Sequence, residues 1–290
     1  MDDKSIGLVL EGGGMRGMYT AGVLDEFLIN GIEADGLVGV SAGILHGISY
    51  LSEQMGRNIR YTLKYRSDPR FMSMKSYFKT GNICETEFCY HVIPEKLYPF
   101  DYDKFAEAAE KIPVFAGCSN VETGKPEYVR LHDLRTDDID AVRASASLPM
   151  ISEIVEYRGM KLQDGGNCDS IPIEFMMSQG FKKNIVVLTR PEGYVKKDSK
   201  SVKLMKLIYK DYPEYVEAAE NRSVMYNATL RLIDELEEKG DIFVIRPSRD
   251  LKVGRGEKDT DKIKRIYKLG RFDGQNVMKE LKSFIENIKN

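Results

Sequence analysis

The sequence predicts an α/β fold of three layers, in which helices cover both faces of a mostly parallel central sheet, with a helical extension toward the C-terminus. Residues 6–10 and 37–40 are short apolar runs, as is typical of buried parallel strands. A helical pattern separates them, so strand, helix and second strand form one βαβ unit whose two carboxyl ends share an edge. Helical periodicity dominates the chain beyond residue 200.

The first helix is predicted by apolar side chains that recur at helical spacing before a glycine of the kind that closes helices. These residues are Ala21, Leu24, Phe27 and Leu28, followed by Asn30-Gly31. Further strand candidates are residues 113–118, 128–131, 161–163, 184–188 and 241–245. Two apolar stripes predict late helices, Met225, Ala228, Leu232, Ile233 and Leu236 in one, and Val277, Leu281, Phe284 and Ile288 in the other.

The composition fits one large globular unit of 290 residues, 42% of them apolar. The formal net charge of -2 is spread without blocks, which argues against nucleic acid as a partner. We divide the chain into a catalytic region, residues 5–190, and a mainly helical segment, residues 191–290, with one strand, packed on the same core. The oligomeric state stays open.

The location of the protein is predicted from what the sequence lacks. Its cysteines, which are Cys84, Cys89, Cys118 and Cys168, follow no metal or redox spacing, so we expect free thiols and neither metal nor cofactor. The first apolar run is too short for a signal sequence, and no run approaches the roughly 20 apolar residues of a membrane span. We therefore expect a cytoplasmic protein that meets lipid from the water side.

A candidate nucleophile follows the second predicted strand, in the motif Gly39-Val40-Ser41-Ala42-Gly43. A serine hydroxyl becomes a useful nucleophile when it is held exposed and a base can take its proton. Gly39 and Gly43 keep side chains away from a sharp turn between strand and helix, and the positive helix N-terminus favours charge on the serine oxygen. Because such pentapeptides also arise by chance, the position between strand and helix carries the interpretation.

A glycine loop, Glu11-Gly12-Gly13-Gly14-Met15-Arg16-Gly17, follows the first predicted strand. It contains the G-x-G-x-x-G pattern of dinucleotide-binding folds, so a nucleotide-binding oxidoreductase is an alternative. Such a fold expects an acidic residue at the end of the second strand, where this chain has Ser41. Backbone N–H groups beside a nucleophile can instead form an oxyanion hole. We choose Gly13 and Gly14 as its donors, with Arg16 orienting the loop or attracting an anionic head group.

The base that activates Ser41 is either Asp164 or a histidine. Asp164 ends a predicted strand and precedes Gly165-Gly166. Because these glycines have no side chains, other backbone segments can come close to the Asp164 carboxylate at the strand end. An Asp-Gly pair is also common in hairpin turns. The histidines are His46, His91 and His132, and none follows residue 132. His46 lies one helical turn past Ser41 and reaches back poorly, so we favour Asp164 over a histidine base.

In this order, Gly-Gly-Gly-Met-Arg-Gly, Gly-Val-Ser-Ala-Gly and Asp-Gly-Gly resemble the patatin-like phospholipase family over roughly residues 5–190. The segment Arg143-Ala144-Ser145-Ala146-Ser147-Leu148-Pro149 is similar to the one before the family's aspartate. The resemblance implies a patatin-like fold and a catalytic dyad of Ser41 and Asp164. It also implies an oxyanion loop of Gly12, Gly13, Gly14 and Arg16, and motif glycines Gly17, Gly39, Gly43, Gly165 and Gly166. Glu11 replaces the aspartate that many members carry, and the region beyond about residue 200 resembles only the bacterial branch.

These residues predict a lipid acyl hydrolase, a serine hydrolase of phospholipase, lysophospholipase or esterase type that works through an acyl-enzyme. Acyl transfer to an alcohol, nucleotide-dependent oxidoreduction and a catalytically silent binding protein are the alternatives. Residues 61–105 are dense in aromatic and methionine side chains, which can line an acyl pocket, rest on a lipid interface or form ordinary core. The expected partner is a lipid or acyl ester, and peripheral membrane contact is a further hypothesis.

Overall fold

The computed structural model describes residues 5–289, and within that range the strands form one eight-stranded mixed sheet. The strand order is β5-β6-β3-β2-β1-β7-β8, and β4 also pairs with β3. The strands are β1 (Ile6–Leu10), β2 (Gly36–Val40), β3 (Val114–Asn120), β4 (Pro126–Arg130), β5 (Val155–Tyr157), β6 (Met160–Asp164), β7 (Lys183–Val187) and β8 (Ile242–Ile245).

Helices of several kinds connect the strands. The α-helices are α1 (Met18–Asn30), α2 (Ala42–Leu51), α3 (Arg57–Tyr65), α4 (Met74–Thr80), α5 (Tyr102–Lys111), α6 (Asp138–Ser145), α7 (Ile173–Ser178), α8 (Val202–Ile208), α9 (Pro213–Glu238), α10 (Thr260–Asn276) and α11 (Met278–Lys289). The 3-10 helices are η1 (Gly14–Gly17) and η3 (Gly165–Asn167), and η2 (Phe88–Leu97) is a π-helix with Pro94 inside it.

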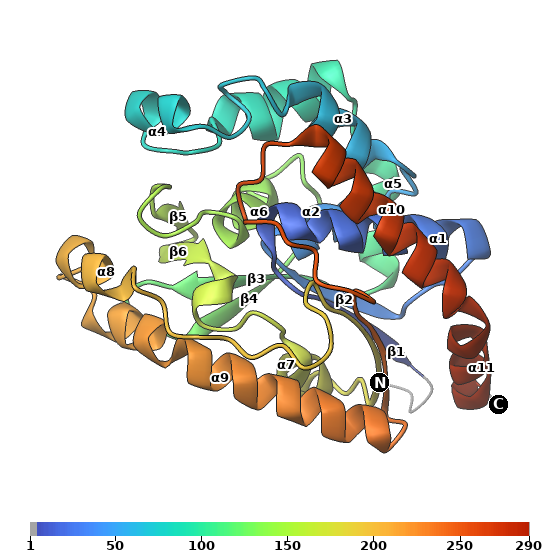
Figure 1. Ribbon diagram of the computed structural model, residues 1–290. Helices are drawn as coiled ribbons and strands as arrows, with labels where there is room; N and C mark the ends of the chain where they lie inside the picture. Colours follow the sequence, from blue (N-terminus) through green and yellow to red (C-terminus); the bar gives the residue numbers. More distant parts are fainter. Residues whose placement is uncertain (1–4, 290) are drawn as a thin grey trace.

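The sheet lies between two layers of helices, which confirms the predicted three-layer α/β fold (Figure 1). Helices α1, α2 and α10 lie on one face, and α7 and α9 lie on the other. Side chains of β1 alternate between these layers: Ile6 and Leu8 join the larger apolar core, and Val9 joins the core beneath α7 and α9. Helices therefore cover both faces of the sheet.

The centre of the sheet is parallel, as predicted, and one side of it is antiparallel. Strands β3, β2, β1, β7 and β8 pair in parallel, whereas β4 and β6 run antiparallel to β3, and β5 runs antiparallel to β6. The sequence patterns at 128–131 and 161–163 indicated strands but not their direction, and β5 was not predicted. Its three residues are too few to show a period.

The C-terminal segment adds an edge strand, β8, and the four helices α8 to α11 to this arrangement. Strand β8 pairs with β7, and α10 packs along α1. The backbones of the two helices are in contact at two glycines. A Cβ at Gly22 would collide with the carbonyl oxygen of Tyr267, and a Cβ at Gly270 would collide with that of Tyr19. Within residues 5–289 no helix combines the length and the apolar composition that crossing a bilayer requires.

Candidate active site

Ser41 lies at the sharp turn between β2 and α2. Its backbone has φ 55° and ψ -121°, a conformation that non-glycine residues adopt only where their surroundings enforce it. The glycines of the motif permit the turn: a Cβ on Gly39 would lie 2.5 Å from the nitrogen of Ile44, and one on Gly43 would collide with the carbonyl oxygen of Leu10. The turn therefore holds Ser41 at the N-terminus of α2.

The last residue of α6 and the segment that follows it fix the backbone of Ser41 and of Asp164. The Ser41 N–H donates to Oγ of Ser145 at 2.9 Å, and that hydroxyl donates to the carbonyl oxygen of Gly117 at 2.6 Å. Two residues later, the carbonyl oxygen of Ser147 accepts a hydrogen bond from the Asp164 N–H at 2.9 Å. Both candidate catalytic residues are thus tied to one stretch of chain.

Strand β3 brings Ser41 and Asp164 to adjacent positions. Val40, the last residue of β2, pairs with Gly117, and Asp164, the last residue of β6, pairs with the next residue, Cys118. Both β3 residues also pair with β4, which occupies the other edge of β3. Strands β2 and β6 therefore follow each other along one edge, and the chain leaves β2 at Ser41 where β6 delivers Asp164.

The carboxylate of Asp164 is buried and keeps one oxygen free. Oδ1 accepts a hydrogen bond from the N–H of Gly166 at 2.9 Å. Oδ2 is buried without a hydrogen-bond partner in the described part of the chain. Between the described atoms no hydrogen bond joins Asp164 to Ser41. The structure brings the two residues together and leaves Oδ2 able to accept a proton.

The glycine loop lies directly beside Ser41. A Cβ on Gly12 would lie 3.3 Å from the Cβ of Ser41, so a side chain there would fit only if its neighbours shifted. The Gly12 N–H donates to the carbonyl oxygen of Ser170 at 3.3 Å. Among residues 5–289, the N–H groups of Gly13 and Gly14 have no acceptor. These two groups, rather than that of Gly12, are available to a developing oxyanion.

Arg16 lies in the first turn after the loop and is buried, with 7% of its surface exposed. Its backbone N–H donates to the carbonyl oxygen of Gly13 at 3.2 Å, whereas its Nε has no partner among the described residues. Burial and the nearby charges of Arg190 and Arg255 lower the pKa of Arg16, and Glu11 opposes this. The side chain is thus a buried cation rather than a surface one.

Comparison with known proteins identifies this arrangement. A family model described as patatin-like phospholipase matches residues 8–177, more than half of the chain. The chain belongs to the patatin-like phospholipase family. A second model, described as a domain of unknown function (DUF6363), matches residues 212–286. The family membership supports lipid acyl hydrolysis in general.

Several relatives share this patatin-like sequence. The chain is 27% identical over 277 residues to the uncharacterized protein YjjU of Escherichia coli (strain K12), which covers 93% of this chain and 76% of YjjU. It is 30% identical over 194 residues to lysophospholipase NTE1 of Cryptococcus neoformans var. neoformans, which covers 63% of this chain and 11% of NTE1. The solved structure of VipD from Legionella pneumophila superposes with a TM-score of 0.44 at 13% identity, over 96% of this chain and 67% of that one.

In this patatin-like phospholipase an apolar cavity of about 160 Å³ opens at Ser41. Its walls come from α2, α3, α6 and η2, and the side chains are aliphatic or aromatic with few polar groups. Representative wall residues are Leu45, Ile48, Tyr61, Phe71, Ile93, Phe100, Leu134 and Val142. A fatty acyl chain has matching chemistry, and its carbonyl would then lie beside the serine.

The aromatic segment predicted at residues 61–105 divides among three environments. Tyr61, Phe71, Met72, Tyr90, Phe100 and Tyr102 line the cavity. Phe88 and Phe105 are fully buried in the core, whereas Met74 and Phe78 on α4 expose 48% and 81% of their surface. The segment therefore forms cavity wall, core and an exposed apolar surface.

Of the histidines, His132 lies away from Ser41, whereas His46 lines the same cavity. His132 is exposed and follows β4, whose last residue, Arg130, pairs with Phe115 near the amino end of β3. Ser41 lies toward the opposite end of that strand. His46 is buried in the cavity wall, and burial lowers its pKa to about 4, so its ring is neutral at pH 7.

Three serines support the site in ways that the sequence did not reveal. Ser145 holds the Ser41 backbone, Ser147 holds the Asp164 backbone, and Ser170 occupies the Gly12 N–H. Ser145 and Ser147 lie in the segment that carries the family resemblance, and that resemblance was the one sequence signal that could have pointed to their supporting role. Ser170 lies in no motif, and only the folded chain brings it to the loop.

Proposed function

We propose that this protein hydrolyses carboxylic acyl esters of lipids through a Ser41–Asp164 dyad and an acyl-enzyme. The observation that carries the proposal is the pairing on β3, where β2 ends before Ser41 and β6 ends at Asp164 on consecutive positions of one strand. The apolar cavity that opens at Ser41 and the lysophospholipase activity named for NTE1 support the same conclusion.

In the proposed reaction, Asp164 Oδ2 takes the proton of Ser41 Oγ as that oxygen attacks the ester carbonyl carbon. The N–H groups of Gly13 and Gly14 donate to the oxyanion. When the intermediate collapses, the leaving alcohol takes the proton from Asp164, and the acyl group stays on Ser41. Water then attacks this ester with the same base, which releases the fatty acid and restores the hydroxyl.

The nucleotide alternative finds no support in the packing of the glycine loop. The space beside its glycines is filled by the chain itself: Thr189 lies against Gly13, and Arg255 lies against Gly14. A pyrophosphate needs that space for close backbone approach. Acyl transfer uses the same acyl-enzyme, so product analysis with added glycerol distinguishes a new ester from free fatty acid.

The dyad is tested by hydrolysis of a short-chain p-nitrophenyl ester. We expect Ser41→Ala and Asp164→Ala each to lose about 10³-fold or more in kcat, and a variant with His46, His91 and His132 replaced by alanine to keep its rate once folding is verified by melting. Loss of activity in the histidine variant with full activity in Asp164→Ala would reject the Ser–Asp mechanism.

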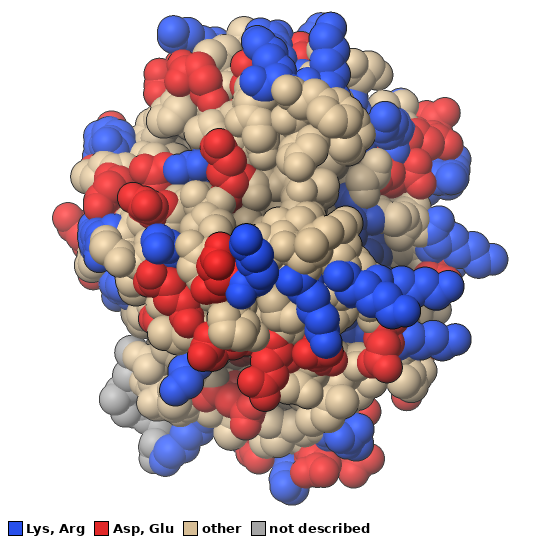
Figure 2. Space-filling model, turned by 90° about the vertical axis from the view of Figure 1, so that its left-hand side faces the viewer, with Lys and Arg blue, Asp and Glu red and all other residues tan. Residues whose placement is uncertain are grey.

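Peripheral membrane contact remains part of the proposal, through a surface formed by α4 and α8. Both helices lie at the left of Figure 1, and Figure 2 shows that face, where Lys and Arg side chains border an area without charged side chains. The exposed apolar side chains of the two helices are Met74, Phe78, Leu204, Leu207 and Ile208. Lys75, Lys79, Lys203 and Lys206 on the same helices can meet anionic lipid.

Sedimentation with vesicles of anionic phospholipid tests this surface. We expect the wild-type protein to sediment, and a Phe78→Ser, Leu207→Ser variant to stay in the supernatant. Phe272→Ser is the matched control, because that side chain is 58% exposed but lies on α10. If the Phe78→Ser, Leu207→Ser variant and the Phe272→Ser control sedimented equally, the surface formed by α4 and α8 would not be the site of membrane contact.

A further inference from the structure

Five cationic side chains surround the outer side of the glycine loop without forming an ion pair. They are Arg16, Arg190, Lys196, Arg222 and Arg255, and we call them the cation cluster. No salt bridge within residues 5–289 includes any of them. Arg135, by contrast, is paired with Asp103 and Asp133. The cluster therefore concentrates cationic side chains that have no salt-bridge partner.

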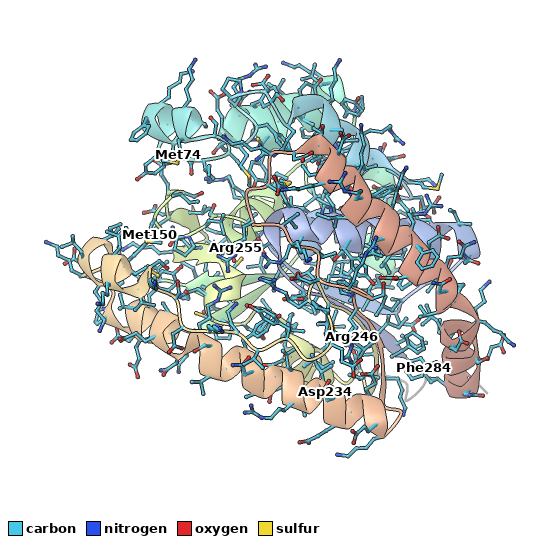
Figure 3. All side chains as sticks on the ribbon, viewed as in Figure 1. Met74, Met150, Asp234, Arg246, Arg255 and Phe284 are labelled. Atoms are coloured by element: carbon cyan, nitrogen blue, oxygen red, sulfur yellow. The ribbon has the colours of Figure 1, made fainter. Side chains whose placement is uncertain are left out.

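Arg255 is held against the loop through its backbone. Its carbonyl oxygen accepts a hydrogen bond from the Met15 N–H at 2.9 Å. Gly14 has φ +56°, and a Cβ there would lie 2.8 Å from that same carbonyl oxygen. The chain before α10 thus covers the glycine loop, and Arg255 in that chain is labelled in Figure 3.

Helix α9 brings a second part of the cluster to the dyad. Arg222 Nη2 lies 3.4 Å from Oγ of Ser170 and 3.2 Å from the position of a Cβ on Gly166, two residues after Asp164. One turn later, the Tyr226 hydroxyl donates to Oε1 of Glu11 at 2.6 Å. Arg222 therefore lies between the catalytic aspartate and the glycine loop.

The remaining cations pack on aromatic rings of the same region. The Lys196 ammonium lies 4.5 Å from the ring centroid of Tyr226, and the Arg190 guanidinium lies 4.3 Å from that of Tyr194. Burial, together with Arg222 and Arg255, lowers the pKa of Lys196 to about 7. These contacts hold the two side chains in place, and the pKa of about 7 leaves Lys196 only partly charged at pH 7.

Two carboxylates lie near the cluster, and neither forms a salt bridge with it in the described part of the chain. Glu11 is buried, and its two oxygens accept hydrogen bonds from the Thr189 N–H and the Tyr226 hydroxyl. Asp164 is the proposed base. The Nε atoms of Arg16 and Arg222 are buried and have no partner among the described residues. Buried donors and charges of this kind are costly unless an anion accepts from them.

We propose that the cation cluster is a binding subsite for the phosphate of a phosphorylated head group on the lipid substrate. The proposal rests on the proposed function, because a head group presupposes an ester at Ser41. None of the five cations lines the apolar cavity, so the acyl chain and the head group extend to different sides of the serine. Guanidinium groups suit this role because their planar donors match phosphate oxygens in pairs.

The subsite also gives the C-terminal segment a role. Arg190, Lys196, Arg222 and Arg255 all lie beyond residues 8–177, and the last two fall within residues 212–286, the region of unknown function. That region therefore completes the substrate site and selects the head group, while the patatin-like region supplies the chemistry.

Calorimetric titration of inorganic phosphate into the full-length Ser41→Ala protein tests the subsite without relying on catalysis. We expect saturable binding that weakens about 10-fold or more when Arg222→Gln or Arg255→Gln is added, since each substitution removes charge-assisted hydrogen bonds. Arg135→Gln is the matched control and should leave binding unchanged. Absence of phosphate binding, or equal binding in all variants, overturns the proposal.

A matched pair of soluble lipids separates a head-group site from a site for free phosphate. We expect the wild-type protein to hydrolyse dihexanoyl phosphatidate with a kcat/KM at least 10-fold above that of uncharged dihexanoylglycerol, and Arg222→Gln to lower the ratio of these two kcat/KM values toward one, whereas Arg135→Gln keeps the wild-type ratio. Phosphate binding without substrate preference overturns the head-group assignment. Phosphate binding with neither lipid hydrolysed would instead reject the proposed function and leave an anion site.

Discussion

The backbone N–H of Ser41 donates to the hydroxyl of Ser145, 104 residues later in the chain, at 2.9 Å. Because that hydroxyl donates in turn to Gly117 on β3, the turn that carries the candidate nucleophile is fastened to the central sheet. Ser41 has a positive φ, so its position depends on such contacts.

Replacing Ser145 by alanine should therefore lower activity, although Ser145 acts through the Ser41 backbone and not on the substrate. Both hydrogen bonds disappear and leave the buried Ser41 N–H without an acceptor, which costs about 1–3 kcal/mol of stability. We expect kcat to fall about 10-fold with little change in KM, as measured by steady-state hydrolysis. Ser147→Ala is the control, because its hydroxyl bonds only to the carbonyl oxygen of Arg143. An equal loss in both variants would contradict a positioning role.

Asp164→Asn should separate the proposed base from its structural role. The amide oxygen can still accept the Gly166 N–H that Oδ1 now accepts, so the η3 turn should persist. The amide cannot take a proton, so we expect kcat to fall about 10³-fold while the melting temperature stays within a few degrees. Thermal melting and steady-state kinetics on one preparation test this, and retained activity would exclude Asp164 as the base.

The sequence was sufficient for the parallel centre of the fold, because β1, α1 and β2 are local and strongly patterned. It was not sufficient for the pairing of β6 with β3, which joins Asp164 to Cys118 across 45 intervening positions and sets the dyad geometry. Strand direction and long-range register depend on the whole sheet rather than on a window of residues. The antiparallel side and η2, with Pro94 inside a helix, therefore emerged only in the structure.

The candidate site shows the same division. Ser41, Asp164 and the glycine loop lie in motifs that a reader can find in the chain. Arg222 lies in a long helix and Arg255 in an irregular segment, and neither is part of a motif. Their proposed role could be recognised only from the structure, in which α9 and the chain before α10 pack against the glycine loop. Likewise, only the structure shows that Ser170 removes the Gly12 N–H from the possible oxyanion donors.

His46 should make stability fall as the solution is acidified. Burial lowers its folded pKa to about 4 from 6.5, so the unfolded chain binds a proton first as the pH falls below 6.5. The stability that neutral His46 contributes is present above pH 6.5 and decreases toward pH 4. The expected loss is about 2 kcal/mol between pH 7 and 5. Urea unfolding at both values measures it, and His46→Gln should show a smaller pH dependence.

A methyl group added at the contact of α1 with α10 should lower the stability of the folded protein. A Cβ at Gly270 would collide with the carbonyl oxygen of Tyr19, which is backbone and cannot move aside alone. We expect Gly270→Ala to destabilise the protein by about 1–3 kcal/mol, as overpacking does. Gly254→Ala is the control, since nothing lies within 4 Å of its Cβ position. Urea unfolding of both variants tests this, and equal midpoints would refute the backbone contact.

The apolar cavity should determine which acyl chains are accepted. Ala146 lines it and is half-buried, so Ala146→Leu would place extra carbon atoms in a space of about 160 Å³. Short acyl groups need little of this volume, whereas long ones need the space that leucine takes. We expect kcat/KM for a p-nitrophenyl decanoate to fall about 10-fold and that for the acetate to stay within twofold. An equal loss for both esters would indicate damage to the site rather than a shortened pocket, and no loss would place the acyl chain outside this cavity.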